Sequence, residues 1–298
     1  MAIFEGSGVA LITPMKENEE VNFEKLEELV EFHINNGTDA IVACGTTGEP
    51  ATLTVPEHLK VIEAVVKTAS GRIPVIGGCG SNDTRTSEEM SVECQKMGCD
   101  AILMVTPYYN KCTQKGLISH YTRVAKGVDL PIILYNVPSR TGVNILPKTA
   151  VELGKTCDNI VAIKEASGNI SQIAKLAALL KEDPVLDIYS GNDDQITAIM
   201  ALGGLGVISV LANICPKETH DITHAFLDGD VKKCADLQLE ALDFINNLFI
   251  EVNPIPIKVA MNLVGMEVGP LRSPLCEMDP ANLEILKKSM INYGLTLA

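Results

Sequence analysis

A lysine stands at the end of an apolar run in the segment IVAIKEASG (160–168). Lys164 follows four apolar residues and precedes Glu165. Apolar surroundings lower the pKa of a lysine, and each unit of lowering yields up to about ten times more neutral amine at neutral pH. A neutral amine can attack a ketone to form an imine, which withdraws electrons from the adjacent carbon. The segment therefore predicts either an imine-forming lysine or an ion pair with Glu165, and both interpretations remain open at this point.

Hydroxyl groups follow other apolar runs. Thr46 and Thr47 lie in GTTGE, Tyr109 in TPYYN and Tyr135 in YNVPSRTG. A phenol in a hydroxyl network can transfer protons during imine formation and carbon–carbon bond formation. Thr46 is suited to bridge two phenols, and Thr47 with its loop backbone is suited to hold a small carboxylate. Taken singly, each residue is explained better by the preference of threonine and tyrosine for strands.

An arginine follows the fifth apolar run. Arg140 lies in PSRTG, a turn sequence. Arginine binds carboxylates through two parallel hydrogen bonds, which predicts a substrate carboxylate here. A surface salt bridge is the alternative explanation.

The elements that must position these residues alternate along the chain. Apolar runs that are continuous, as expected for strands buried on both faces, occupy 8–14, 40–46, 73–79, 101–107, 131–138, 160–166, 186–192 and 206–210. Helical patterns occupy 22–37, 56–71, 87–98, 115–127, 147–155, 170–183 and 193–204. This rhythm predicts an α/β fold, a (β/α)8 TIM barrel. An open doubly wound sheet is the alternative, but GGCGSN (77–82) lacks the G-x-G-x-x-G spacing of a nucleotide loop.

The chain changes character near residue 215, after which only helical patterns occur. We therefore predict a catalytic barrel over 1–214 and a C-terminal helical region over 215–298 that packs on it. Barrel enzymes carry their chemistry where strands end and βα loops begin. We therefore expect the lysine, the tyrosines, the threonines and the arginine to meet at one end of the barrel.

Composition excludes several classes of function. The 298 residues are 46% hydrophobic and carry a formal net charge of −14, which disfavours nucleic acid and anionic membranes as partners. The N-terminal residues lack the pattern of a signal peptide, and the nine scattered cysteines contain no C-x-x-C, which together predict a cytoplasmic protein. His220 and His224 share the i, i+4 spacing that metals use but lack the glutamate of H-E-x-x-H, so no metal is predicted.

The motifs GTTGE, TPYYN, YNVPSRTG, KEASG and GVISV occur in this order, and together they resemble the dihydrodipicolinate synthase family over essentially the whole chain. EVNPIPIK (251–258) also resembles the C-terminal region of that family. The resemblance implies a pyruvate-dependent aldolase-type lyase that condenses pyruvate with L-aspartate 4-semialdehyde to 4-hydroxy-tetrahydrodipicolinate. This is the first dedicated step of diaminopimelate and lysine biosynthesis. It also implies a homotetramer built from two dimers, with no cofactor.

The resemblance assigns roles to individual residues. It implies that Lys164 forms the Schiff base, that Tyr135 is the principal proton donor and acceptor, and that Thr46 and Tyr109 complete the relay. Tyr109 would reach into the site of a neighbouring subunit. The implied substrate-binding residues are Thr47 for the pyruvate carboxylate, Ile208 through its backbone, Arg140 for the carboxylate of the semialdehyde, and Gly191.

Two other functions stay open. N-acetylneuraminate lyases and 2-keto-3-deoxy sugar-acid aldolases share the lysine and tyrosine, but GTTGE and the arginine of PSRTG favour the synthase. A non-catalytic barrel would be expected to have lost the set of residues at the strand ends, which is complete here.

The sequence departs from the pattern of the family in one region. Lysine-inhibited members carry a polar cluster that Asn82, Tyr108 and His58 match, whereas Val55 stands where histidine is frequent, Thr86 where glutamate is frequent, and Pro50 replaces a small polar residue. Loss of a carboxylate that pairs with an ammonium weakens binding by about 1.5–3 kcal/mol. We therefore predict weak or absent inhibition by lysine.

Overall fold

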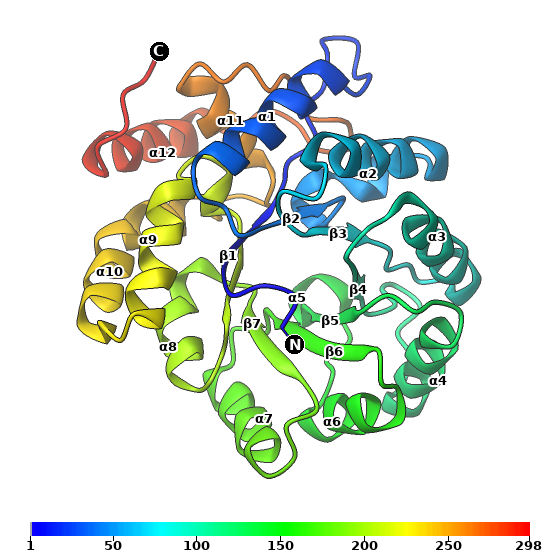
Figure 1. Ribbon diagram of the computed structural model, residues 1–298. Coiled ribbons are helices and arrows are strands. Elements are labelled where there is room, and N and C mark those ends of the chain that lie inside the picture. Colours follow the sequence, from blue (N-terminus) through cyan, green and yellow to red (C-terminus); the bar gives the residue numbers. More distant parts are fainter. Residues whose placement is uncertain (1) are drawn as a thin grey trace.

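The computed structural model describes residues 2–298 and contains a closed barrel of eight parallel strands (Figure 1). The strands pair in chain order, and β8 closes the barrel on β1. Their bounds are β1 Gly6–Ala10, β2 Ala40–Ala43, β3 Val75–Gly78, β4 Ala101–Val105, β5 Ile132–Asn136, β6 Ile160–Glu165, β7 Asp187–Ser190 and β8 Gly206–Ser209. The predicted (β/α)8 barrel is confirmed.

Helices surround the barrel and continue beyond its last strand. The first eight are α1 Phe23–Asn35, α2 Val55–Ala69, α3 Thr84–Met97, α4 Gln114–Ala125, α5 Pro138–Thr141, α6 Pro147–Thr156, α7 Ile170–Glu182 and α8 Ile196–Ala201. After β8 follow α9 Pro216–Leu227, α10 Val231–Asn247, α11 Ile255–Leu263 and α12 Pro280–Asn292. Helix α9 packs on β1, α10 packs on α8 and α9, and α12 packs on α10 and α11 (Figure 1). The helical extension predicted from the sequence is therefore present.

Alternation of side chains along each strand produces two apolar layers. In β6, Ala162 points into the barrel and packs with Ile133 and Ile208, whereas Ile163 faces the surrounding helices. Because both faces of every strand are covered, the strands read as continuous apolar runs.

The strands end earlier than the apolar runs that predicted them. β1 ends at Ala10, although Leu11 and Ile12 are buried. The backbone N–H of Ile12 donates to the side chain of Asn213 at 2.9 Å rather than to a neighbouring strand. The loops at this end are thus packed into the protein, which extends the apolar pattern beyond the strands. The helix predicted over 193–204 likewise divides into a 3₁₀ turn, Asp193–Gln195, and the short α8.

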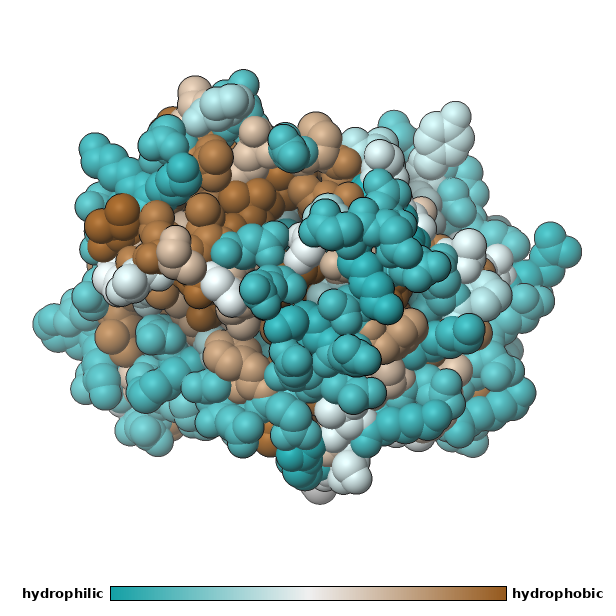
Figure 2. All heavy atoms as spheres, turned by 90° about the horizontal axis from the view of Figure 1, so that it is seen from above, coloured by the Kyte–Doolittle hydropathy of each residue, from teal (hydrophilic) through white to brown (hydrophobic). Residues whose placement is uncertain are grey.

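The face of the molecule drawn in Figure 2 is mostly hydrophilic. Seen from above, an apolar area interrupts the polar side chains (Figure 2). Within the part of the chain that the structure describes, no helix combines the length and the apolar character needed to cross a membrane.

Candidate active site

Lys164 lies inside the barrel near the carboxyl end of β6. It shares the inner face of that strand with Ala162 and Ala166, and its side chain is 5% exposed. Its Nζ atom lies 4.4 Å from the ring centroid of Tyr135 on the neighbouring β5. Among residues 2–298, the ion pairs formed by lysines and arginines do not include Lys164. The amine is therefore buried beside an aromatic ring and forms no ion pair at contact distance within the described residues.

Glu165 points to the opposite side of β6. Its carboxylate accepts hydrogen bonds from Asn136 Nδ2 at 3.1 Å, from the backbone N–H of Ser167 at 2.9 Å and from Gln172 Nε2 at 3.4 Å. The alternative interpretation of the sequence, an ion pair between Lys164 and Glu165, is therefore wrong. Consecutive strand residues face opposite sides of a sheet, so these two side chains cannot meet.

Gly191 gives the lysine stem its space. A Cβ atom on this residue would lie 2.6 Å from Ala166 Cβ and 3.1 Å from Lys164 Cε. The backbone N–H of Gly191 donates to Glu165 O at 2.8 Å, which keeps the β7 loop against β6. Ile208, on β8, is fully buried in the inner apolar layer of the barrel.

Thr46 and Tyr135 come together at the carboxyl ends of the strands. Both line a small cavity with residues of β3, β4 and the loop that follows β2. Thr46 begins a 3₁₀ turn, Thr46–Gly48, and Glu49, which caps its C-terminus, has a left-handed backbone with φ of 54°. A second, larger cavity of about 510 Å³ adjoins it and includes Thr46 and Arg140 in its lining.

Asn253, which sequence reasoning did not single out, links two predicted binding residues. Its Nδ2 donates to Thr47 Oγ1 at 3.0 Å, and its carbonyl oxygen accepts from an Nη atom of Arg140, also at 3.0 Å. Thr47 is 2% exposed. The only sequence signal for this contact was the position of Asn253 in the EVNPIPIK motif. The C-terminal region thus contributes directly to the site.

Tyr109 lies apart from the other predicted residues. It is 91% exposed and has a left-handed backbone with φ of 70°. Neither described cavity includes Tyr109 in its lining. Within one chain, Tyr135 shares a cavity with Thr46 and lies beside Lys164, whereas Tyr109 lines neither cavity.

Two buried acidic residues brace the loops around the site. Asp193 Oδ2 accepts the backbone N–H groups of Val210 and Leu211, each at 3.0 Å, and burial raises the pKa of its carboxyl. Glu49 Oε1 accepts from Lys258 Nζ at 2.8 Å, and both side chains are at most 1% exposed. Burial lowers the pKa of Lys258, and the carboxylate of Glu49 opposes that effect. Neither the contacts of Asp193 nor the ion pair of Glu49 was predicted from the sequence, because the residues that they join are not neighbours along the chain.

Most of the cluster compared with lysine-inhibited enzymes lies in the wall of the larger cavity, whose lining does not include Asn82. Pro50, Val55, His58, Thr86 and Tyr108 all line it. His58 Nε2 lies 2.7 Å from Gly78 O, and burial lowers the pKa of this imidazole. Val55 is exposed.

The chain is similar to known proteins over nearly its whole length. The model of the dihydrodipicolinate synthetase family matches residues 3–291. The 4-hydroxy-tetrahydrodipicolinate synthase of Lachnoclostridium phytofermentans is 61% identical over 295 residues, which cover 99% of this chain and all of that protein. The crystal structure of dihydrodipicolinate synthase from Aquifex aeolicus superposes with a TM-score of 0.95 at 46% identity and covers 99% of each chain. The chloride-inhibited synthase of Acinetobacter baumannii, solved in complex with pyruvate, has a TM-score of 0.95 at 41% identity and covers 98% of this chain and 99% of its own.

Proposed function

The chain belongs to the dihydrodipicolinate synthetase family, and from this premise we propose that it condenses pyruvate with L-aspartate 4-semialdehyde to 4-hydroxy-tetrahydrodipicolinate. It is a lyase of diaminopimelate and lysine biosynthesis. The observation that carries the assignment is Lys164, a buried lysine that lies 4.4 Å from the Tyr135 ring inside the barrel and forms no ion pair within residues 2–298. The alternative function, that of an N-acetylneuraminate lyase or a sugar-acid aldolase, is not favoured, since the relatives compared above are synthases.

In the proposed mechanism, the neutral amine of Lys164 attacks the carbonyl carbon of pyruvate, and loss of water gives the imine. The protonated imine withdraws electrons, so the methyl group loses a proton and the resulting enamine attacks the aldehyde of the second substrate. The amino group of that substrate then displaces the lysine and closes the ring.

We propose that Tyr135 and Thr46 carry the protons of these steps, because they line one cavity and the Tyr135 ring lies 4.4 Å from Lys164 Nζ. Tyr109 would complete the relay from a neighbouring subunit. Its 91% exposure and left-handed backbone support this assignment, since a partner surface would give the phenol an environment that one chain lacks. The same observation supports the proposed homotetramer.

Substrate carboxylates are assigned to two places. Thr47, Gly191 and the backbone of Ile208 would hold pyruvate, and Arg140 would hold the carboxylate of the semialdehyde at the mouth of the larger cavity. Arg140 already donates to Asn253 O, which fixes its guanidinium at the rim. A bidentate contact with a carboxylate would use its remaining N–H groups.

The deciding experiment measures kcat/KM with pyruvate and three acceptors in parallel: aspartate 4-semialdehyde, N-acetylmannosamine and glyceraldehyde. We expect a clear preference for the semialdehyde, which Arg140→Ala reduces mainly through KM. Preference for a sugar-type acceptor would reject the proposed reaction while retaining the imine chemistry.

We also propose that lysine inhibits weakly or not at all. Thr86 offers no carboxylate to a ligand ammonium, and its hydroxyl donates to Asp83. His58 is engaged by the carbonyl of Gly78. Calorimetric titration with lysine is expected to give no micromolar binding, and micromolar affinity would contradict the proposal.

The remaining assignments follow from the family and the fold. We propose that residues 1–214 form the catalytic barrel and 215–298 a helical region packed on it, with a cytoplasmic location. The contact of Asn253 with Thr47 supports a role for the second region in completing the site of the first.

A further inference from the structure

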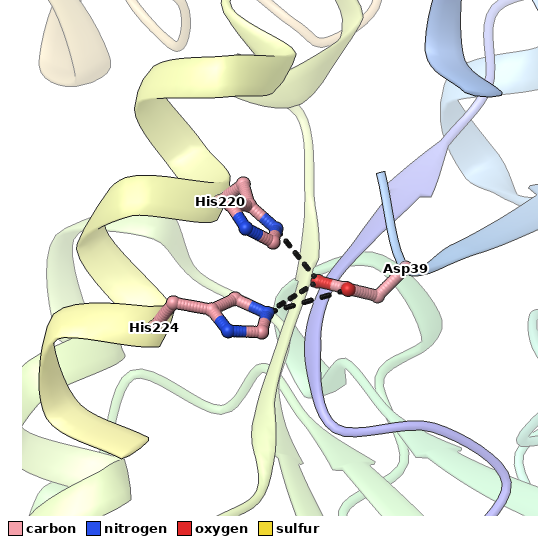
Figure 3. A group of neighbouring side chains, drawn as sticks. All are labelled: Asp39, His220 and His224. Atoms are coloured by element: carbon pink, nitrogen blue, oxygen red, sulfur yellow. Dashed lines mark hydrogen bonds and ion pairs between the residues drawn. The ribbon is translucent and has the colours of Figure 1, made fainter. Parts of the chain in front are cut away.

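The amino-terminal end of the barrel gathers two histidines and one carboxylate. His220 and His224 lie one turn apart on α9, and Asp39 immediately precedes β2 (Figure 3). One ligand atom from each residue lies within 4.8 Å of the others. All three side chains are partly exposed, at 30%, 35% and 22%. The candidate active-site residues Lys164 and Tyr135, by contrast, lie at the carboxyl ends of β6 and β5.

We propose that Asp39, His220 and His224 bind a divalent transition-metal ion of the Zn²⁺ type. The structure supplies the carboxylate that the sequence pattern lacked. Histidine nitrogens and carboxylate oxygens are ordinary zinc ligands, and three protein ligands leave a fourth position for water. The partial exposure of the group leaves room for that water.

The distances between the ligand atoms support this proposal. His220 Nδ1 lies 3.3 Å and His224 Nε2 lies 3.2 Å from Asp39 Oδ2. Ligand bonds of about 2.0–2.1 Å in a tetrahedron place ligand atoms about 3.3–3.4 Å apart. Hydrogen bonds between N–H and oxygen are usually about 2.9–3.0 Å long. The two separations between histidine and carboxylate therefore fit edges of a metal tetrahedron better than optimal hydrogen bonds, and the histidine nitrogens lie within 4.8 Å of each other.

The surrounding backbone orients the ligands. The N–H of Ser7 donates to Asp39 Oδ2 at 2.7 Å, an outer contact of the kind that fixes metal-binding carboxylates. A Cβ atom on Gly6 would lie 2.3 Å from Asp39 Oδ2 and 2.8 Å from His224 Nε2, so a side chain here would fill the site. The two imidazole rings stack at 3.7 Å with their planes 26° apart, and both turn toward the carboxylate (Figure 3).

A bound ion would tie α9 to the start of β2, across 181 residues of sequence. We expect it to stabilise the folded chain, because a ligand that binds only the folded state raises its stability. It would act far from Lys164, so the turnover of each site should not depend on it.

Equilibrium dialysis of the whole protein against Zn²⁺, in a phosphine reductant, tests the proposal. The expected result is one ion per chain, a Tm raised by Zn²⁺, and a Co²⁺ spectrum of a tetrahedral nitrogen and oxygen site without thiolate charge transfer. His224→Gln and Asp39→Asn should each weaken binding at least about 10- to 100-fold, since even outer-shell changes have effects of that size. Glu218→Gln, on the exposed side of the same helix, is the matched control and should bind normally.

Circular dichroism of each variant shows whether it folds. If either His224→Gln or Asp39→Asn does not fold, Zn²⁺ binding is measured with the other variant and with His220→Gln. Absence of stoichiometric uptake by the unaltered protein would overturn the proposal. Uptake that survives the ligand substitutions but is lost in Cys276→Ser, which removes an exposed thiol, would also overturn it.

Discussion

The buried ion pair between Glu49 and Lys258 offers the sharpest test of how the C-terminal region supports the active site. Lys258 Nζ donates to Glu49 Oε1 at 2.8 Å and to Thr13 O at 3.2 Å, and it also contacts Pro270 O. Glu49 Oε2 accepts the backbone N–H of Arg272 at 3.0 Å. The perturbation is Lys258→Met, which preserves much of the volume but removes the charge and the donors.

The expected cost follows from what the substitution leaves behind. Glu49 would keep the backbone N–H of Arg272 as a donor and lose the cation that pairs with it in the described part of the chain, while the carbonyl of Thr13 would lose a donor. Removing one partner of a buried ion pair costs about 3–5 kcal/mol of unfolding free energy. An unfolding entropy of about 2.1 cal/mol/K per residue over 298 residues corresponds to about 1.6 °C of Tm per kcal/mol, so we expect Tm to fall by about 5–8 °C.

Chemical unfolding of Lys258→Met, Glu49→Gln and the double variant measures the coupling. The double variant should lose at least about 1 kcal/mol less than the sum of the single variants, because it contains no unpaired buried charge. We also expect kcat/KM to fall in Lys258→Met, since Glu49 ends the turn that holds Thr46 and Thr47. A loss below about 1 kcal/mol in Lys258→Met, or strict additivity, would refute the reasoning.

Two further predictions concern the lysine pocket and the acid side of the stability profile. Gly191→Ala would place a Cβ atom 2.6 Å from Ala166 Cβ and displace the Lys164 stem. Since a displacement of about 1 Å can cost about 100-fold in rate, we expect kcat/KM to fall by that order and borohydride trapping with pyruvate to slow. Gly127→Ala at the end of α4 is the control, and equal activity of both variants would contradict the prediction. Burial lowers the pKa of His33 to about 3 from its ordinary value of 6.5. The unfolded chain therefore binds more protons than the folded chain between these pH values. As pH falls through this window, the burial of His33 lowers the free energy of unfolding by up to about 1.4 kcal/mol per pH unit. His33→Gln should flatten the profile below pH 6.5, and denaturant titrations with parallel pH profiles would exclude this contribution.

The sequence by itself determined the barrel and the end of it that carries the chemistry. Continuous apolar runs such as 160–166 report strands covered on both faces, and the intervening helical patterns report the outer ring. These patterns arise from contacts that repeat every two or about four residues, so they can be read locally. The same rhythm placed Lys164, Tyr135 and Thr46 at strand ends.

Tertiary structure decided which of these side chains meet. Local pattern left open whether Lys164 pairs with Glu165, and the closed barrel turned the lysine inward and the glutamate toward Asn136. Pairs such as Asn253 with Thr47 lie 206 residues apart. In the sequence, each residue of such a contact looks like an ordinary surface residue. Only barrel closure and the packing of the C-terminal helices bring the halves together, because no short-range periodicity encodes a contact between segments so distant along the chain.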